Sequence, residues 1–222
     1  MNNANNCFSS GDREHISQRI AKLEQQTDAE VVCAVATESG RYDRAESLCG
    51  LAVGLMALIS GNKLAGMGGW DTSSALSLGL QVVLVVGGFV LGSVLASYWH
   101  GLRSLFTSNA EMASEVSRSV HQVFSQCGIG GTRQRGGVLI YLSLFERRLE
   151  VRCDRAVAGK VKQPDLDAIR DAVLDRIRAG DAPGGIIAGL DRAAEVLARA
   201  IPATGSTTDS LSNDLITFHP RP

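Results

Sequence analysis

Charge is almost missing from one long stretch of this 222-residue chain. The sequence has 22 basic and 23 acidic side chains, yet between Ser47 and Leu102 only Lys63 and Asp71 carry a formal charge. A soluble domain of average composition has charges on about a quarter of its residues. The chain therefore combines two segments of different composition, one apolar and one rich in charged residues.

Several functional signatures are also missing. The net charge is −1 and the arginines are interleaved with carboxylates, so we expect no nucleic-acid partner, which would need a basic stripe. The five cysteines form no C-x-x-C pair, which disfavours a disulfide framework or zinc site and suits a reducing compartment. We expect no cleavable signal peptide, because the first residues lack a basic segment followed by an apolar run. Walker, dinucleotide-binding and G-x-S-x-G motifs are absent from the sequence.

The apolar segment predicts a two-helix transmembrane hairpin over residues 45–102. Residues 75–99, ALSLGLQVVLVVGGFVLGSVLASYW, carry no charge, and a helix of that length exceeds the roughly 30 Å hydrocarbon core of a bilayer. Residues 47–62 are a shorter span, which Lys63 can extend by snorkelling. We expect three aromatic residues to lie at the membrane interface, namely Trp70, Tyr98 and Trp99.

The basic residues around the hairpin predict its orientation. Arg41, Arg44 and Arg103 flank it on the domain side, against Lys63 alone in the turn. The positive-inside rule then places the soluble domain in the cytoplasm and the hairpin in the inner membrane. The expected partners are the lipid bilayer and other membrane proteins. The glycines of both spans would support helix pairing within one chain or between chains, so the oligomeric state stays open.

The charged part predicts an α/β fold that the hairpin splits into residues 9–44 and 105–201. A capping signal precedes an amphipathic helix over 12–26, and residues 29–36, AEVVCAVA, form a buried strand. One helix and one strand bury too little apolar surface to fold alone. They therefore need partners from beyond the hairpin.

Those partners follow in order along the chain. A capping box at Ser108 begins a helix, and residues 137–144, GVLIYLSL, and 149–153, LEVRC, read as two strands joined by a charged turn. Two more helices are expected over 164–179 and 184–200. The pattern predicts a sandwich with a small central sheet flanked by helices.

The end of the chain, residues 203–222, is rich in Ser, Thr and Asp. Such a composition predicts a mostly disordered tail. A short extended stretch over 215–218 is the part of it that could dock on the domain.

Four segments of the charged part occur in a characteristic order: a helix before TDAEVVCAVA, an intervening helix, the run RGGVLIYLSLFERRLEVRCDRAV, and RAGDAPGGIIAGLDRAAEVL. Together they resemble the TPM domain family, which occurs in bacterial membrane proteins and in photosystem-associated thylakoid lumen proteins. The resemblance implies a TPM-like α/β sandwich with about four strands, here interrupted by the hairpin, as in a bacterial subgroup of membrane proteins. Some members have been described as acid phosphatases or as binding divalent metals, and others are linked to photosystem or membrane-protein maintenance.

The resemblance is weakest directly after the strand over residues 149–153, the second of the two strands that the charged turn joins. Secreted members commonly have Gly-x-Gly-Leu-Glu there, where this chain has Cys153-Asp154-Arg155-Ala156-Val157. An inherited site near this loop is therefore in doubt.

Three acidic residues at strand ends and a helix start are candidate ligands for Ca²⁺ or Mg²⁺: Glu30, Asp154 and Asp181. Asp181 is equally well explained as a helix cap, and Glu30 as a strand-edge charge. Arg133 and Arg135, in a glycine-rich turn, are candidates for holding an anion or lipid phosphate.

Cys127 and Arg133 have the C-x5-R spacing of cysteine phosphatases, but Cys127 is expected to end a helix rather than to precede one. At that end the helix dipole opposes a thiolate. We therefore interpret this motif as a helix C-cap followed by a flexible turn.

Two functions remain open from the sequence. The first is a membrane-anchored TPM-domain protein that acts as a non-enzymatic interaction or maintenance module. The alternative is a weak divalent-metal-dependent phosphatase or hydrolase that uses Asp154 and neighbouring carboxylates.

Overall fold

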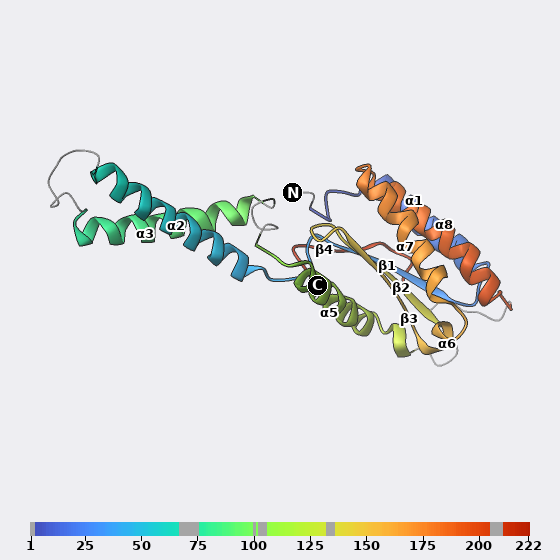
Figure 1. Ribbon diagram of the computed structural model, residues 1–222. Coiled ribbons are helices and arrows are strands. Elements are labelled where there is room, and N and C mark those ends of the chain that lie inside the picture. Colours follow the sequence, from blue (N-terminus) through green and yellow to red (C-terminus); the bar gives the residue numbers. More distant parts are fainter. Residues whose placement is uncertain (1–2, 67–75, 100, 102–105, 132–135, 205–210) are drawn as a thin grey trace. The chain divides into compact units, whose positions relative to one another are not determined.

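The computed structural model describes residues 3–66, 76–99, 101, 106–131, 136–204 and 211–222 (Figure 1). The chain forms two compact units. The first comprises Met1–Gly40 and Met112–Pro222, and the second comprises Arg41–Glu111.

The first unit is built on a four-stranded sheet with the order β3-β2-β1-β4. Its strands are β1 (Glu30–Ala36), β2 (Gly137–Ser143), β3 (Arg148–Cys153) and β4 (Ile216–Phe218). β1 pairs in parallel with β2 and with β4, while β2 and β3 form an antiparallel hairpin. The pairing of β1 with β2 joins segments from before and after the apolar segment. The predicted α/β sandwich with a small sheet is confirmed.

Helices cover both faces of this sheet (Figure 1). One face packs against α1, α7 and α8, and the other against α5. These helices are α1 (Ser10–Glu24), α5 (Asn109–Gln126), α7 (Gln163–Arg178) and α8 (Ala182–Ala200), with a short α6 (Arg155–Ala158) and a 3₁₀ turn, η1 (Ile129–Gly131).

The two covered faces explain the continuous apolar runs of β1 and β2. Successive side chains of a strand point to opposite faces. Val31 and Val35 therefore join the core under α1, α7 and α8, whereas Val32 and Ala36 join the core under α5. A strand buried on both faces needs no polar alternation.

The helix boundaries follow the capping residues. Ser9 caps α1, where its side chain accepts from the N–H of Asp12, and Ser108 Oγ accepts from the N–H of Glu111 at the start of α5. Gly128 (φ 65°) and Gly180 (φ 84°) follow the ends of α5 and α7, in the left-handed conformation that glycine adopts at little cost.

The end of the chain corrects one prediction. Residues 211–222 were expected to belong to a mostly disordered tail, but Leu215 is buried and Ile216–Phe218 form β4 along β1. The composition of the tail is polar, yet the edge of β1 offers backbone partners and an apolar surface that a short strand can use. The prediction of disorder is therefore wrong for this part, whereas docking of the extended stretch is confirmed.

The second unit contains two long apolar helices, α2 (Asp43–Gly66) and α3 (Leu78–Tyr98). Each is long and apolar enough to cross a membrane. α2 continues beyond Lys63 to Gly66, so the helix is longer than the uncharged span of residues 47–62, as expected if the Lys63 side chain reaches toward the membrane surface. The interfacial candidates Tyr98 and Trp99 lie at the end of α3 and are exposed, while Trp70 lies outside the described residues.

The glycines of α2 and α3 pair these helices within one chain. A Cβ atom added at Gly88 would lie 2.8 Å from the Cα of Gly54, and one added at Gly92 would lie 2.9 Å from the Cα of Gly50. The two backbones thus approach as closely as small residues permit. The structure thereby assigns four of the glycines to pairing within the hairpin.

Candidate functional site

Polar side chains collect at the carboxyl ends of the parallel strands β1 and β2. Thr37, Glu38 and Ser39 follow β1 directly, Ser143 ends β2, and Glu146 lies in the turn before β3. All five are buried. In open α/β sheets this edge is where ligands usually bind, so it is the candidate functional site.

A chain of hydrogen bonds joins these residues to Tyr141. Ser39 Oγ lies 3.0 Å from Tyr141 Oη and donates to Ser143 Oγ at 2.8 Å, which in turn donates to Glu146 Oε2. Because Ser39 uses its proton toward Ser143, the phenol of Tyr141 must be the donor in the first bond. The chain therefore runs in one direction and ends at a carboxylate.

Two further contacts fix the backbone at Ser39. Its N–H donates to Glu146 Oε1 at 2.8 Å, and its carbonyl accepts from Ser119 Oγ of α5 at 2.9 Å. We call the five residues Ser39, Ser119, Tyr141, Ser143 and Glu146 the carboxyl-edge network. Its hydrogen bonds connect Ser39, which follows β1, to β2, to α5 and to the turn between β2 and β3.

The protonation of Tyr141 suits this structural role. Burial, with a smaller contribution from the charge of Glu146, raises the pKa of Tyr141 to about 12, although its hydrogen bonds to Ser39 and Ser119 act in the opposite direction. The phenol therefore stays protonated near neutral pH and remains a donor.

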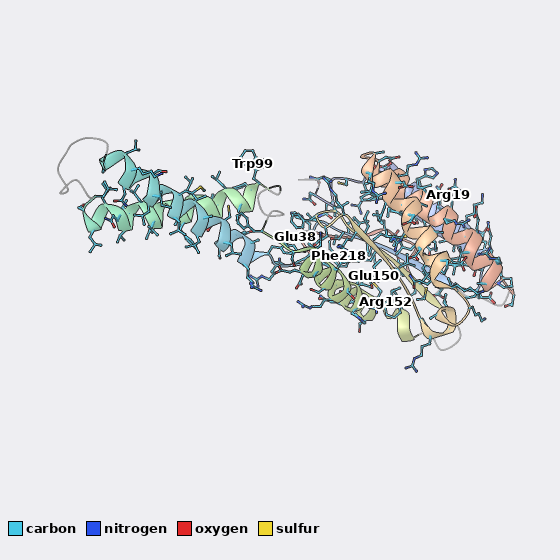
Figure 2. The ribbon with its side chains drawn as sticks, viewed as in Figure 1. Arg19, Glu38, Trp99, Glu150, Arg152 and Phe218 are labelled. Atoms are coloured by element: carbon cyan, nitrogen blue, oxygen red, sulfur yellow. The ribbon has the colours of Figure 1, made fainter. Side chains whose placement is uncertain are left out.

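The C-terminal segment closes the same edge of the sheet. The N–H of Thr37 donates to the Phe218 carbonyl at 3.1 Å, and the N–H of Glu38 donates to the Pro220 carbonyl at 2.9 Å. Arg221 Nη1 forms an ion pair with Glu38 Oε1 at 3.3 Å. The backbone of the chain end thus occupies the position next to β1. Glu38 and Phe218 are labelled in Figure 2.

The three predicted metal ligands are not brought together. Glu30 begins β1 and pairs with Gly137, and the N–H of Asp154 donates to the Gly137 carbonyl from the other side, so these two lie at one sheet edge. Asp181 instead is the N-cap residue that precedes α8. Within the described ranges, no group of three His, Cys, Asp or Glu residues could hold a metal ion.

Two of these carboxylates serve as helix caps. Asp154 Oδ1 accepts from the N–H of Ala156 at 2.9 Å, at the start of α6. Asp181 Oδ1 accepts from the N–H of Gly184 at 2.8 Å, at the start of α8. The capping interpretation of Asp181 is therefore confirmed. The anion candidates Arg133 and Arg135 lie outside the described residues, and their role stays a prediction.

The cysteine chemistry that the C-x5-R spacing suggests has no support. Cys127 follows the last residue of α5, and burial raises the pKa of its thiol. Burial also raises the pKa of Cys153, to about 11. Nucleophilic cysteines need the opposite shift.

Sequence reasoning missed the carboxyl-edge network. Tyr141 stands in an apolar run, and the other four residues are ordinary serines and one glutamate of a charged turn. One available signal was the tyrosine, since a buried phenol needs a hydrogen-bond partner.

Comparisons with known proteins support the fold. The TPM domain family model matches residues 104–196, which include α5, β2, β3, α6, α7 and most of α8. The NMR structure of the BA42 protein from the psychrophilic bacterium Bizionia argentinensis is similar, with a TM-score of 0.58 and 15% identity, covering 95% of this chain and 95% of that chain. At this identity the likeness concerns the fold alone. No curated protein matches the chain.

Proposed function

We propose that this chain is a membrane-anchored protein whose α/β unit, matched by the TPM domain model over residues 104–196, is a TPM domain that acts as a non-enzymatic interaction module. The hairpin of α2 and α3 is the proposed anchor. The inner membrane is the proposed location, with the TPM domain on the cytoplasmic side.

The observation that carries the anchor is the exposure of apolar side chains on both helices. A core helix of a soluble protein buries such side chains, each worth about 1.5–3 kcal/mol. Here many stay exposed on α2 and α3, among them Leu51, Leu55, Met56, Ile59, Val82, Val83, Val86, Val90 and Leu91. Apolar surface of this extent is the signature of a membrane or protein contact, and α2 and α3 have the length of membrane spans.

The connectivity supports two crossings rather than one. Residues on both sides of the hairpin, Met1–Gly40 and Met112–Pro222, belong to one folded unit. A single crossing would place these two parts of one sheet on opposite sides of the membrane. The cytoplasmic orientation rests on Arg41, Arg44 and Arg103 against Lys63.

We expect only the segment between α2 and α3 to be reachable from outside the cytoplasm. A short epitope placed within residues 67–75 should be cleaved by external protease in spheroplasts, while epitopes at Met1 and Pro222 should be protected until the membrane is opened. Cleavage at both termini with protection of the 67–75 epitope would reverse the orientation. Protection of all three epitopes would mean that the hairpin does not cross the membrane, and cleavage at only one terminus would show a single crossing.

The non-enzymatic role is supported by how the buried polar groups are used. In the carboxyl-edge network the hydroxyl of Ser39 donates to another serine rather than to a base, and Ser39 itself is buried. A nucleophile needs an adjacent base and access to substrate. The network instead stabilises the edge of the sheet.

We predict that Asp154→Ala lowers stability without any change in metal response. Loss of a helix cap costs about 0.5–2 kcal/mol, whereas a metal ligand would make wild type alone gain stability with added cation. The measurement is thermal unfolding of the full chain with and without Ca²⁺, Mg²⁺ or Mn²⁺.

Asp181→Ala is the matched control, because it removes a cap of the same chemistry at α8. Phosphate-ester hydrolysis should be followed in parallel. Turnover that requires a cation and disappears in Asp154→Ala alone would replace the interaction module by the hydrolase.

A further inference from the structure

Strand β3 forms one open edge of the sheet. Among the strands of the described residues, it neighbours β2 alone. The N–H of Asp154 donates to the Gly137 carbonyl, so the alternate residues 148, 150 and 152 also direct their backbone groups toward β2. The N–H and C=O groups of Leu149, Val151 and Cys153 therefore point away from the sheet, toward the open edge.

The side chains of β3 divide between the two faces of the sheet. Leu149, Val151 and Cys153 pack with the core under α1, α7 and α8. Glu150 lies opposite Tyr141, and Arg152 lies opposite Leu139, so both are on the α5 face. Figure 2 labels Glu150 and Arg152 on this strand.

Arg152 is incompletely satisfied. Its Nη1 atom is buried and has no hydrogen-bond partner among the described residues. A buried guanidinium N–H without an acceptor is unfavourable, and a carboxylate would be its best partner because the bond is charge-assisted. Within the described chain, neither a hydrogen bond nor an ion pair gives it that carboxylate.

A second copy of β3 would supply the carboxylate. Two β3 strands can pair antiparallel in those registers in which the outward-pointing backbone N–H and C=O groups of residues 149, 151 and 153 form hydrogen bonds between the two copies. If Val151 faces Val151 of the second copy, Glu150 stands opposite Arg152 of that copy, and Arg152 opposite its Glu150. The neighbouring registers centre on Glu150 or Arg152 and place like charges face to face, which is unfavourable.

In the favourable register the charged pairs are the non-hydrogen-bonded pairs of the ladder, whose side chains lie closest together. We propose that the β3 edge binds a second copy of this chain, antiparallel about Val151, with two reciprocal Glu150–Arg152 ion pairs. Charges on an edge strand often serve to block such pairing. The alternation of signs here makes the edge self-complementary instead, and each Arg152 guanidinium gains a carboxylate of the second copy. The inference goes beyond the proposed function, because the edge belongs to the TPM domain and does not depend on the anchor.

Reversal of the charges tests this register. The full chain in detergent is measured by sedimentation velocity over a range of concentrations, as wild type, Glu150→Arg, Arg152→Glu and the double variant. Each single variant sets like charges opposite one another twice, and we expect its dimer dissociation constant to rise about ten-fold or more. The double variant restores both pairs with the signs exchanged and should return to the wild-type constant.

Arg192→Glu is the matched control, since Arg192 pairs with Glu195 on α8, away from β3. It should leave the dissociation constant unchanged. A wild type that stays monomeric overturns the proposal, as do single variants that dimerise like wild type or a double variant without recovery. An equal loss in Arg192→Glu would mean that overall charge, not the β3 edge, controls association.

Discussion

Replacement of Glu146 by alanine is expected to destabilise the α/β unit by about 3 kcal/mol or more. The carboxylate accepts from the Ser39 N–H and from the Ser143 hydroxyl, and both donors are buried. Each buried donor that loses its partner costs about 1–3 kcal/mol. The free energy of unfolding, measured by urea denaturation of the full chain in mild detergent, checks the prediction.

Two variants make this result specific. Glu146→Gln keeps one carbonyl acceptor and the side-chain shape, so we expect it to lose less than the alanine variant. Glu195→Ala removes an exposed carboxylate that pairs with Arg192, and such surface pairs contribute about 0–1 kcal/mol. Equal losses for Glu146→Ala and Glu195→Ala would mean that the carboxyl-edge network does not stabilise the domain.

Replacement of Gly88 by leucine is expected to force α2 and α3 apart. A Cβ atom at this position would lie 2.8 Å from the Cα and 3.1 Å from the N of Gly54. These are backbone atoms, which cannot turn aside as a flexible side chain can. Overpacking of this kind costs about 1–3 kcal/mol or more, and in a membrane close packing itself drives helix association.

The neighbouring glycine provides the control. At Gly87 an added Cβ atom would meet nothing within 4 Å. Gly87→Leu therefore introduces the same side chain into the same helix without a steric clash. The fraction of protein that stays monodisperse after heating in detergent should fall sharply for Gly88→Leu and stay close to wild type for Gly87→Leu. The same loss in both variants would disprove the intrachain packing.

Much of the fold could be predicted because its signals are local. The absence of charge over residues 47–102, the capping sequence at Ser9 and the apolar run of 137–144 each lie within one element. Helix capping and the alternation of side chains act over one turn or two residues, so consecutive residues suffice to recognise them.

The candidate site could not be predicted in the same way. Ser39 and Glu146 are 107 positions apart, and Thr37 and His219, whose side chains lie 3.0 Å apart, are separated by 182. Each residue is unremarkable in its own segment. Their roles arise when β1 pairs in parallel with β2 and β4, which places the ends of three distant segments at one edge.

The sequence alone determined the division of the chain into an apolar and a charged part, the positions of its long helices and of three of its strands, and the TPM-like order of those elements. These features depend on neighbouring residues, whereas the short α6 and η1 were not predicted. The tertiary structure decided which glycines pair α2 with α3, which serines are buried with a carboxylate, that the chain end adds a strand to β1, and that β3 is left as an open edge. Those outcomes depend on contacts between segments far apart in the chain, whose geometry only the packed sheet and helices define.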